Sequence, residues 1–189
     1  MRVFHPHNGR AVLLHTGARD ARASAWSRDG LWLACGCRNE GILLHDMAPM
    51  SSESLHLNSG SGSASSYRLK AHTHKITSID FSHDSQLLAS CSWDKSIIVW
   101  GVHVRQLFAN IPLSAWPTAL VWAPTRLLLA CAMMDRRVLV YLASLHFHPE
   151  FLHLSGTTMT PVAELLAHNE GVWSLAWSHL TASLNPAQS

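Results

Sequence analysis

The chain repeats itself, and this feature limits its possible folds more than any other. Three segments align without gaps: 25–45, 80–100 and 121–141. A fourth segment, 167–178, aligns with 71–82. Self-similarity at a period of tens of residues is typical of proteins built from equivalent units that bury their apolar surfaces against one another. We therefore expect a row of repeated units in place of one irregular core.

An aromatic ring closes each unit, at Phe4, His45, Trp100 and Tyr141, and the spacings are 41, 55 and 41 residues. Within the units, short apolar runs alternate with Asp, Gly, Ser and Pro, which predicts short strands joined by tight turns. A period of about 40 to 45 residues that ends on such a ring is typical of the four-stranded blades of a β-propeller. The predicted fold class is all-β, with three complete blades and partial blades at both ends.

The most specific string is Leu87–Trp100, which contains Ser-Trp-Asp-Lys and ends in Ile-Ile-Val-Trp. This string resembles the WD-repeat family, and the resemblance covers nearly all of the chain outside two loops and the C-terminal tail. In that family a hydrogen-bonded tetrad ties each blade together. The resemblance assigns the tetrad of this repeat to His72, Ser90, Asp94 and Trp100. A buried imidazole needs an acceptor and a donor, which a carboxylate and a hydroxyl supply, so we expect the tetrad to rigidify the blade.

The other two complete repeats depart from the tetrad. Their residues at the four positions are Gly17, Cys35, Asn39 and His45 in the first repeat, and Leu113, Cys131, Asp135 and Tyr141 in the third. Neither set can form the full circuit, so we expect apolar packing between strands to hold these blades together. Ser, His and Asp are also the residues of a catalytic triad, but a tetrad buried at a blade edge leaves the serine no route to a substrate. We therefore expect no catalysis.

The repeats also define the domain organisation. They place a propeller segment over residues 1–178, with complete repeats at about 17–46, 71–101 and 113–142, partial units at 1–15 and 167–178, and an irregular tail at 179–189. Three complete blades are fewer than a ring needs, so we expect the segment to belong to a longer propeller. The alternative is a four-blade ring, in which residues 1–3 and 11–15 complete a blade with 172–177 and the tail.

Two insertions, at residues 46–66 and 142–160, follow the closing rings of the first and third repeats. We expect both to be loops between the third and fourth strands of a blade. The first is rich in Ser and Gly, as flexible linkers are, and phosphorylation of its serines is an alternative role. The second contains His146, His148, Glu150 and His153. Because no single strand or helix face explains their spacing, we expect no metal site there.

Charge and hydropathy exclude several classes of function. The formal net charge is +2 and the basic residues form no cluster, which argues against nucleic acid as a partner. Residues 1–16 lack the apolar run of a signal peptide. The most apolar stretch, 111–134, is interrupted by three prolines and Arg126, so we expect no membrane span.

The cysteines bear on the cellular compartment. Cys35, Cys37, Cys91 and Cys131 all lie in apolar runs, and no pair has the C-x-x-C spacing of a metal or redox site. We expect buried, reduced thiols. They indicate an intracellular protein, cytoplasmic or nuclear, without a bound metal or cofactor.

The expected function is that of a non-catalytic scaffold that binds other proteins or peptides, including the remaining blades of a longer propeller, with no small-molecule substrate. The resemblance places the residue before each turn aspartate on an exposed rim, here Arg38, Trp93 and Met134. These residue types are enriched at the centres of protein interfaces. The alternatives are that Trp93 merely packs on its own turn, that the chain is a fragment without independent function, and that it is an enzyme built on a propeller.

Overall fold

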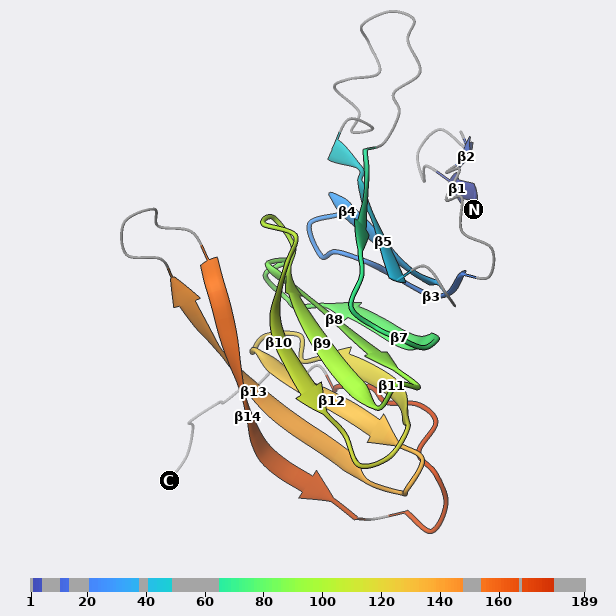
Figure 1. Ribbon diagram of the computed structural model, residues 1–189, viewed down its shortest axis with the longest axis vertical. Helices are drawn as coiled ribbons and strands as arrows, with labels where there is room; N and C mark the ends of the chain where they lie inside the picture. Colours follow the sequence, from blue (N-terminus) through green and yellow to red (C-terminus); the bar gives the residue numbers. More distant parts are fainter. Residues whose placement is uncertain are drawn as a thin grey trace, which may run out of the picture.

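The structure, a computed structural model, describes residues 2–4, 11–13, 21–37, 41–48, 65–147, 154–166 and 168–178. Within these residues β1 (Arg2–Phe4) pairs with β2 (Ala11–Leu13) in a two-stranded sheet. Three four-stranded antiparallel sheets follow in chain order, and we call them the first, second and third blades (Figure 1). The prediction of an all-β fold with three four-stranded blades is confirmed. No helix long and apolar enough to cross a membrane occurs in the described part of the chain.

Each blade runs from an inner to an outer strand without crossovers. The strands are β3 (Ala21–Trp26), β4 (Trp32–Cys37), β5 (Gly41–Asp46) and β6 (Ser66–Leu69) in the first blade; β7 (Ile76–Phe81), β8 (Leu87–Ser92), β9 (Ser96–Gly101) and β10 (Gln106–Pro112) in the second; and β11 (Pro117–Trp122), β12 (Leu128–Met133), β13 (Val138–Phe147) and β14 (Leu154–Leu165) in the third. The second strands β4 and β8 are buried along their whole length, and neither contains a charged residue.

A Ser-x-Asp turn joins the first two strands in two of the blades. In the second blade the Ser82 hydroxyl donates to Asp84 Oδ1 at 2.6 Å and accepts the N–H of Leu87 at 2.9 Å. In the first blade Ser27 makes the same two bonds, to Asp29 and from Trp32. Short polar side chains that bond the backbone nearby favour such turns. The repeated turn chemistry is therefore a local cause of the repeated strand pairs.

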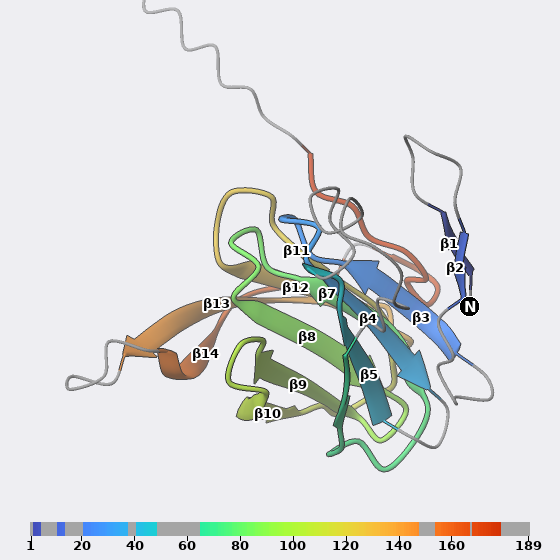
Figure 2. The same cartoon turned by 90° about the horizontal axis from the view of Figure 1, so that it is seen from above.

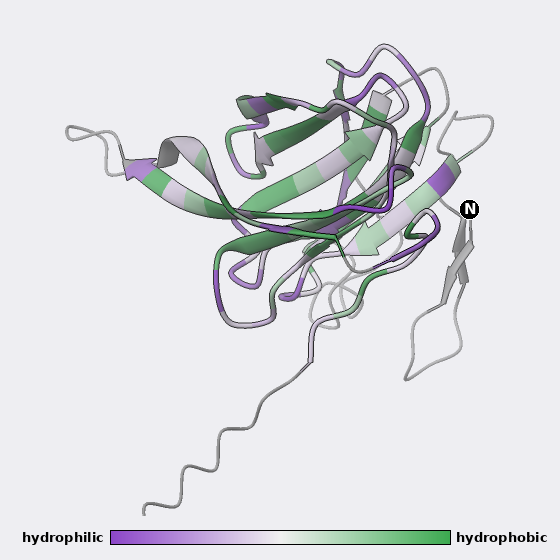
Figure 3. Cartoon of the chain, turned by 90° about the horizontal axis from the view of Figure 1, so that it is seen from below, coloured by the Kyte–Doolittle hydropathy of each residue, from purple (hydrophilic) through white to green (hydrophobic). Residues whose placement is uncertain are grey.

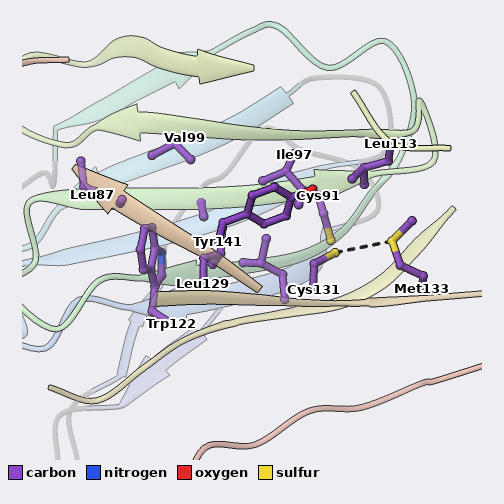
Figure 4. Close-up of a cluster of buried hydrophobic side chains, with 13 residues drawn as sticks. Leu87, Cys91, Ile97, Val99, Leu113, Trp122, Leu129, Cys131, Met133 and Tyr141 are labelled. Carbon is purple, nitrogen blue, oxygen red and sulfur yellow. Dashed lines mark hydrogen bonds between the residues drawn. The ribbon is translucent and has the colours of Figure 1, made fainter. Parts of the chain in front are cut away.

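The blades pack face to face, with the inner strands β3, β7 and β11 side by side (Figures 1 and 2). The strands contain most of the hydrophobic residues, and the turns are more hydrophilic (Figure 3). One apolar core lies between the first two blades, and another lies between the second and third blades, where Trp122 is buried with Leu87, Ile97 and Tyr141 (Figure 4). Burial of each large apolar side chain contributes about 1.5–3 kcal/mol, so these inter-blade cores are a main source of stability.

The second insertion differs from the expectation of a loop over residues 142–160. The strands β13 and β14 continue into it and pair from Leu142↔Thr160 to His146↔Gly156, and this hairpin extends beyond the other two sheets (Figures 1 and 2). Burial alternates along residues 141–146, as it does in a strand with one covered face. Thr157, Thr158 and Thr160 favour strand conformation on the returning side. The insertion is thus largely an elongated hairpin.

The first insertion falls between β5, which ends at Asp46, and β6, which begins at Ser66. Residues 49–64 lie outside the described part of the chain, so the expectations of a flexible, phosphorylated Ser-rich loop stay predictions. His148, Glu150 and His153 lie outside it too, as does the tail at 179–189.

The segment 168–178 lies against the third blade without forming a strand. The Val172 N–H donates to the Met133 carbonyl at 3.2 Å, and the Trp177 indole donates to the Val121 carbonyl at 3.2 Å. Val172 is buried on Ala132 together with Leu175. This is the position of the next inner strand, but no described residue pairs with it in a ladder. Because β1 pairs with β2 and with no strand of a blade, the described sheets form an open arc, and the four-blade ring is not observed.

Candidate protein-interaction site

The structure brings together the four residues assigned to the tetrad of the second blade. His72 precedes β7, Ser90 lies in β8, Asp94 lies in the turn after β8, and Trp100 lies in β9. His72 Nδ1 lies 2.9 Å from Asp94 Oδ2, and His72 Nε2 lies 2.8 Å from Ser90 Oγ. The Trp100 indole N–H donates to Ser90 Oγ at 3.3 Å. Because Nδ1 faces a carboxylate, it holds the proton, and Nε2 accepts from the serine.

Electrostatics hold this circuit in one protonation state. Burial lowers the pKa of His72, and the hydrogen bond to Asp94 opposes the shift only in part. Burial alone would raise the pKa of Asp94, but hydrogen bonds from Ser96 and the Thr73 N–H, together with His72, bring it below its usual value. A neutral imidazole and an ionised carboxylate result at neutral pH. The Ser90 side chain is fully buried, so the circuit acts as a brace within the blade.

The first and third blades replace the tetrad with other contacts. In the third blade Asp135 accepts from Arg137 Nε at 2.8 Å, and Arg137 Nη1 donates to Glu164 Oε1 at 3.1 Å, so an exposed ion network occupies this edge. In the first blade His45 Nδ1 lies 2.7 Å from Ser66 Oγ. Gly17 and Asn39 lie outside the described residues. The Arg137–Glu164 contact links the turn before a third strand to a fourth strand, and the His45–Ser66 contact links a third strand to a fourth strand. The tetrad instead links the segment before the first strand to the second and third strands.

Two of the three predicted rim residues are exposed at one end of the inner strands. Trp93 is 40% exposed and Met134 is 36% exposed. The Trp93 ring also contacts its surroundings: its centroid lies 6.1 Å from that of Trp116, and Lys75 Nζ lies 2.9 Å from the Trp93 centroid. Trp93 is therefore exposed at the rim and also packs against neighbouring side chains. Arg38 lies outside the described residues.

A pocket of about 280 Å³ opens between the blades at this end. We call it the rim pocket, and its lining residues are Arg22, Lys75, Ile76, Thr77, Trp93, Thr118, Met134 and Trp173. Trp93 and Met134 thus share one cavity. Trp173, in the segment after the third blade, is 69% exposed and also lines this cavity.

A β-bulge in each inner strand supplies one lining residue of the pocket. Strand pairing shifts register between Ala21 and Ala23, between Ile76 and Ser78, and between Pro117 and Ala119. The skipped residues are Arg22, Thr77 and Thr118, and all three line the pocket. A bulge re-aims the side chain of its extra residue, and bulges are over-represented beside functional sites.

These bulge residues were not predicted from the sequence, although the repeat alignment contains their signal. Arg22, Thr77, Thr118 and Trp173 each lie five positions after the tetrad-histidine position of their own repeat. They comprise an arginine, two threonines and a tryptophan, so three chemically different side chains occupy equivalent positions. Variable side chains at one fixed position of every unit are what a binding surface on a repeated scaffold needs.

The two bulge threonines also connect neighbouring units. Thr77 Oγ1 donates to the Pro117 carbonyl of the next blade at 3.2 Å. One repeat later, Thr118 Oγ1 donates to the Val172 carbonyl. Because these hydroxyls are engaged between units, the lining groups best exposed to a partner are the large apolar side chains of Trp93, Met134 and Trp173.

Comparisons with known proteins agree with the architecture. A family model described as "WD domain, G-beta repeat" matches residues 63–101. The chain is 30% identical over 82 residues to Protein HIRA of Dictyostelium discoideum, covering 43% of this chain and 7% of that protein. It is 34% identical over 74 residues to guanine nucleotide-binding protein subunit beta-1 of Drosophila melanogaster, covering 39% of this chain and 22% of that protein. The chain therefore spans less than a quarter of either relative.

A solved structure, that of U3-55K, has a similar fold. It superposes with a TM-score of 0.58 at 22% sequence identity, and the match covers 74% of this chain and 41% of that one. The likeness includes more of the chain than the family model does, in agreement with blades on both sides of the matched repeat.

Proposed function

Because this chain belongs to the WD40 repeat family, we propose that it is a non-catalytic protein-interaction module whose binding surface is the rim pocket. WD40 domains are commonly protein-interaction scaffolds and generally non-catalytic. The proposal that is specific to this chain concerns the residues: Trp93, Met134 and Trp173 would contact the partner, and the bulges would hold the pocket open.

The observation that supports this proposal is the convergence of exposed large apolar side chains on one cavity. Trp93, Met134 and Trp173 come from three different structural units, and Trp116 adjoins them through its contact with Trp93. Single exposed apolar residues are ordinary on a protein surface, but a contiguous group around a pocket is typical of an interaction site. Trp in particular is over-represented among residues that dominate binding energy.

The cysteines support the expectation of an intracellular location. All four are buried thiols outside disulfides. Burial, with the neighbouring Cys37, raises the pKa of the Cys35 thiol to about 11, which keeps it protonated and unreactive. Structural thiols of this kind are typical of proteins that work in a reducing compartment.

A matched pair of tryptophan variants tests the proposal. Trp26 is 45% exposed, a fraction similar to the 40% of Trp93. It lies at the opposite end of β3 from Arg22 and does not line the pocket. We expect Trp93→Ala to remove specific partners from affinity purifications of the full chain in cells, and Trp26→Ala to retain them. Equal recovery of partners by both variants would refute the rim pocket as the binding surface. Thermal unfolding of both variants controls for loss of the fold.

A further inference from the structure

We propose that the sulfur atoms of Cys91, Cys131 and Met133 form a binding site for a single copper(I) ion between the second and third blades. This site does not depend on a protein partner at the rim pocket, so the two proposals are independent. It follows from the position of the three sulfurs, from their chemistry and from the path that leads to them.

The three sulfurs lie together in the apolar core between these blades (Figure 4). Cys91 in β8 and Cys131 in β12 are hydrogen-bonded to each other through their side chains. Cys131 Sγ lies 3.9 Å from the Sδ of Met133, which is two residues further along the same strand. Because the two cysteines come from different blades, no spacing along the chain indicates the site. The packing of the blades brings two thiols and a thioether to one place.

The separation of these sulfurs suits coordination of one ion. Bonds from a metal to a cysteine sulfur are about 2.3 Å long, so two sulfurs on one trigonal or tetrahedral ion lie about 3.8–4.0 Å apart. The distance of 3.9 Å between the sulfurs of Cys131 and Met133 falls within that range. Ligands that already have the required spacing lose little freedom on binding, which favours affinity.

The kinds of ligand select the ion. Thiolate and thioether sulfurs are soft donors that favour copper(I), whereas zinc sites usually take further ligands from His, Cys or carboxylates. In the described part of the chain, no group of three or more His, Cys, Asp and Glu side chains is arranged to hold a metal ion. The apolar side chains of Ile97, Leu113 and Leu129 belong to the same core and keep water from the sulfurs.

Protonation of the two thiols is coupled. The hydrogen bond with Cys131 lowers the pKa of the Cys91 thiol, against the opposing effect of burial, and the contact with Thr77 lowers it further. The same hydrogen bond, together with burial, raises the pKa of the Cys131 thiol. A bound cation reverses this unfavourable effect, because a thiol that coordinates a metal is deprotonated. Both protons pass to solvent on binding, and copper stays in its +1 state.

The rim pocket gives an ion a route to the sulfurs. Thr77 lines that pocket, and its Oγ1 lies 3.3 Å from Cys91 Sγ. Met134 also lines the pocket, is 36% exposed, and is the next residue in the chain after Met133. An arriving ion would meet the thioether of Met134 first. The Cys91 sulfur therefore lies one side chain behind an open cavity, and a metal site needs such a path of entry.

Anaerobic titration of the reduced, purified full chain with copper(I), in competition with the chromophoric chelator bicinchoninate, tests the site. We expect one tightly bound ion per chain, and X-ray absorption of that ion should show only sulfur neighbours, at about 2.3 Å. Failure to compete with the chelator, or nitrogen and oxygen neighbours, would overturn the inference.

Thermal unfolding distinguishes a native site from thiols of the unfolded chain. One equivalent of copper(I) should raise the unfolding temperature, because a ligand that binds the folded state stabilises it. A lowered unfolding temperature would show that the unfolded chain binds the ion more tightly, and it would refute the native site.

Matched variants locate the ion. Cys131→Ala should abolish its binding, whereas Cys35→Ala should retain it, because Cys35 is a buried thiol at the equivalent position of the first repeat. Equal copper binding by these two variants would contradict the site. Met133→Leu conserves side-chain volume and keeps the fold if Cys131→Ala does not, and it should weaken binding by about tenfold or more. Unchanged affinity in Met133→Leu would refute the three-sulfur site.

Discussion

At the scale of single residues, the tetrad differs from the ion network that replaces it in the third blade. Asp94 is nearly buried and bonds a buried imidazole, whereas Asp135 and Arg137 are partly exposed. Removal of a partner from a buried polar group leaves that group unsatisfied, but removal of a surface ion pair has little effect. The same residue type, at the same position of two repeats, therefore has two different roles.

This contrast predicts unequal losses of stability. Asp94→Ala should lower the free energy of unfolding by roughly 1–3 kcal/mol, because the Nδ1–H of His72 loses its acceptor in a buried site. Asp135→Ala should lower it by about 0–1 kcal/mol, and Asn39→Ala should also have little effect. Denaturant midpoints of the variants provide the measurement. Similar losses for Asp94→Ala and Asp135→Ala would contradict the role assigned to the tetrad.

The buried histidines predict a pH dependence of stability. Burial lowers the pKa of both His72 and His45 in the folded chain, from an ordinary value of 6.5. Below that pH the unfolded chain binds more protons than the folded chain, so the free energy of unfolding should fall as the pH is lowered from about 7.5 to about 5.5. His45→Phe, which places a carbocyclic ring at this position, should make the dependence shallower. An unchanged slope in that variant would show that His45 does not contribute.

At the scale of elements, each inner strand combines pairing within its own blade with contacts to the next unit. The β-bulges give β7 and β11 an extra residue, and its hydroxyl reaches the following unit: Thr77 bonds Pro117, and Thr118 bonds Val172. A regular strand would direct alternate side chains to the two faces of the sheet and offer no such residue. The bulge residues Thr77 and Thr118 thus contribute both to the contacts between units and to the lining of the rim pocket.

Replacement of the bulge hydroxyl tests this dual role. Thr77→Val keeps the shape of the side chain but removes the hydroxyl that bonds Pro117 of the next blade and lies 3.3 Å from the Cys91 carbonyl of its own blade, and it should lower the free energy of unfolding by about 0.5–1.5 kcal/mol. Thr73→Val is the control, because Thr73 is exposed and bonds Asp94 through its backbone N–H. Denaturant titration distinguishes the two variants. Equal stability of Thr77→Val and wild type would mean that the hydroxyl contributes nothing through either of these bonds.

At the scale of the whole molecule, the arc leaves apolar surface uncovered on the third blade. Leu142, Val162, Leu165 and Leu166 are all exposed on or just after its two outer strands, while the segment containing Val172 covers only the inner part. In a row of blades, each face is normally covered by the next unit. A further blade would cover this outer half, and additional blades as a partner stay a prediction.

The exposed face predicts self-association of the chain by itself. Each large apolar side chain left in water forgoes roughly 1.5–3 kcal/mol of burial, so contact between copies is favourable. We expect oligomers in size-exclusion chromatography with light scattering, and a larger monomer fraction for the double variant Val162→Lys, Leu165→Lys. Extension of the chain with further blades should also favour the monomer. A stable monomer of the unmodified chain would contradict this prediction.

The sequence by itself determined the all-β class and the three blades, and its resemblance to the WD-repeat family assigned the tetrad residues. Strand pattern and turn chemistry are local properties that recur at a fixed spacing, so one chain contains enough copies to identify them, whereas the full tetrad occurs in one complete repeat. The hairpin at 142–160 was predicted wrongly as a loop. The alternating burial along 141–146 that identifies a strand is visible only in the structure.

Only the tertiary structure decided the rim pocket. Arg22 and Trp173 lie at opposite ends of the chain, and the angle between blades, which no local pattern encodes, brings them to one cavity. The bulges are likewise a property of pairing between two strands, because one strand cannot show which of its residues its neighbour will skip. The sequence shows that the third blade lacks a full tetrad. That Arg137 instead bonds Glu164 follows from the long pairing between β13 and β14, which only the structure shows.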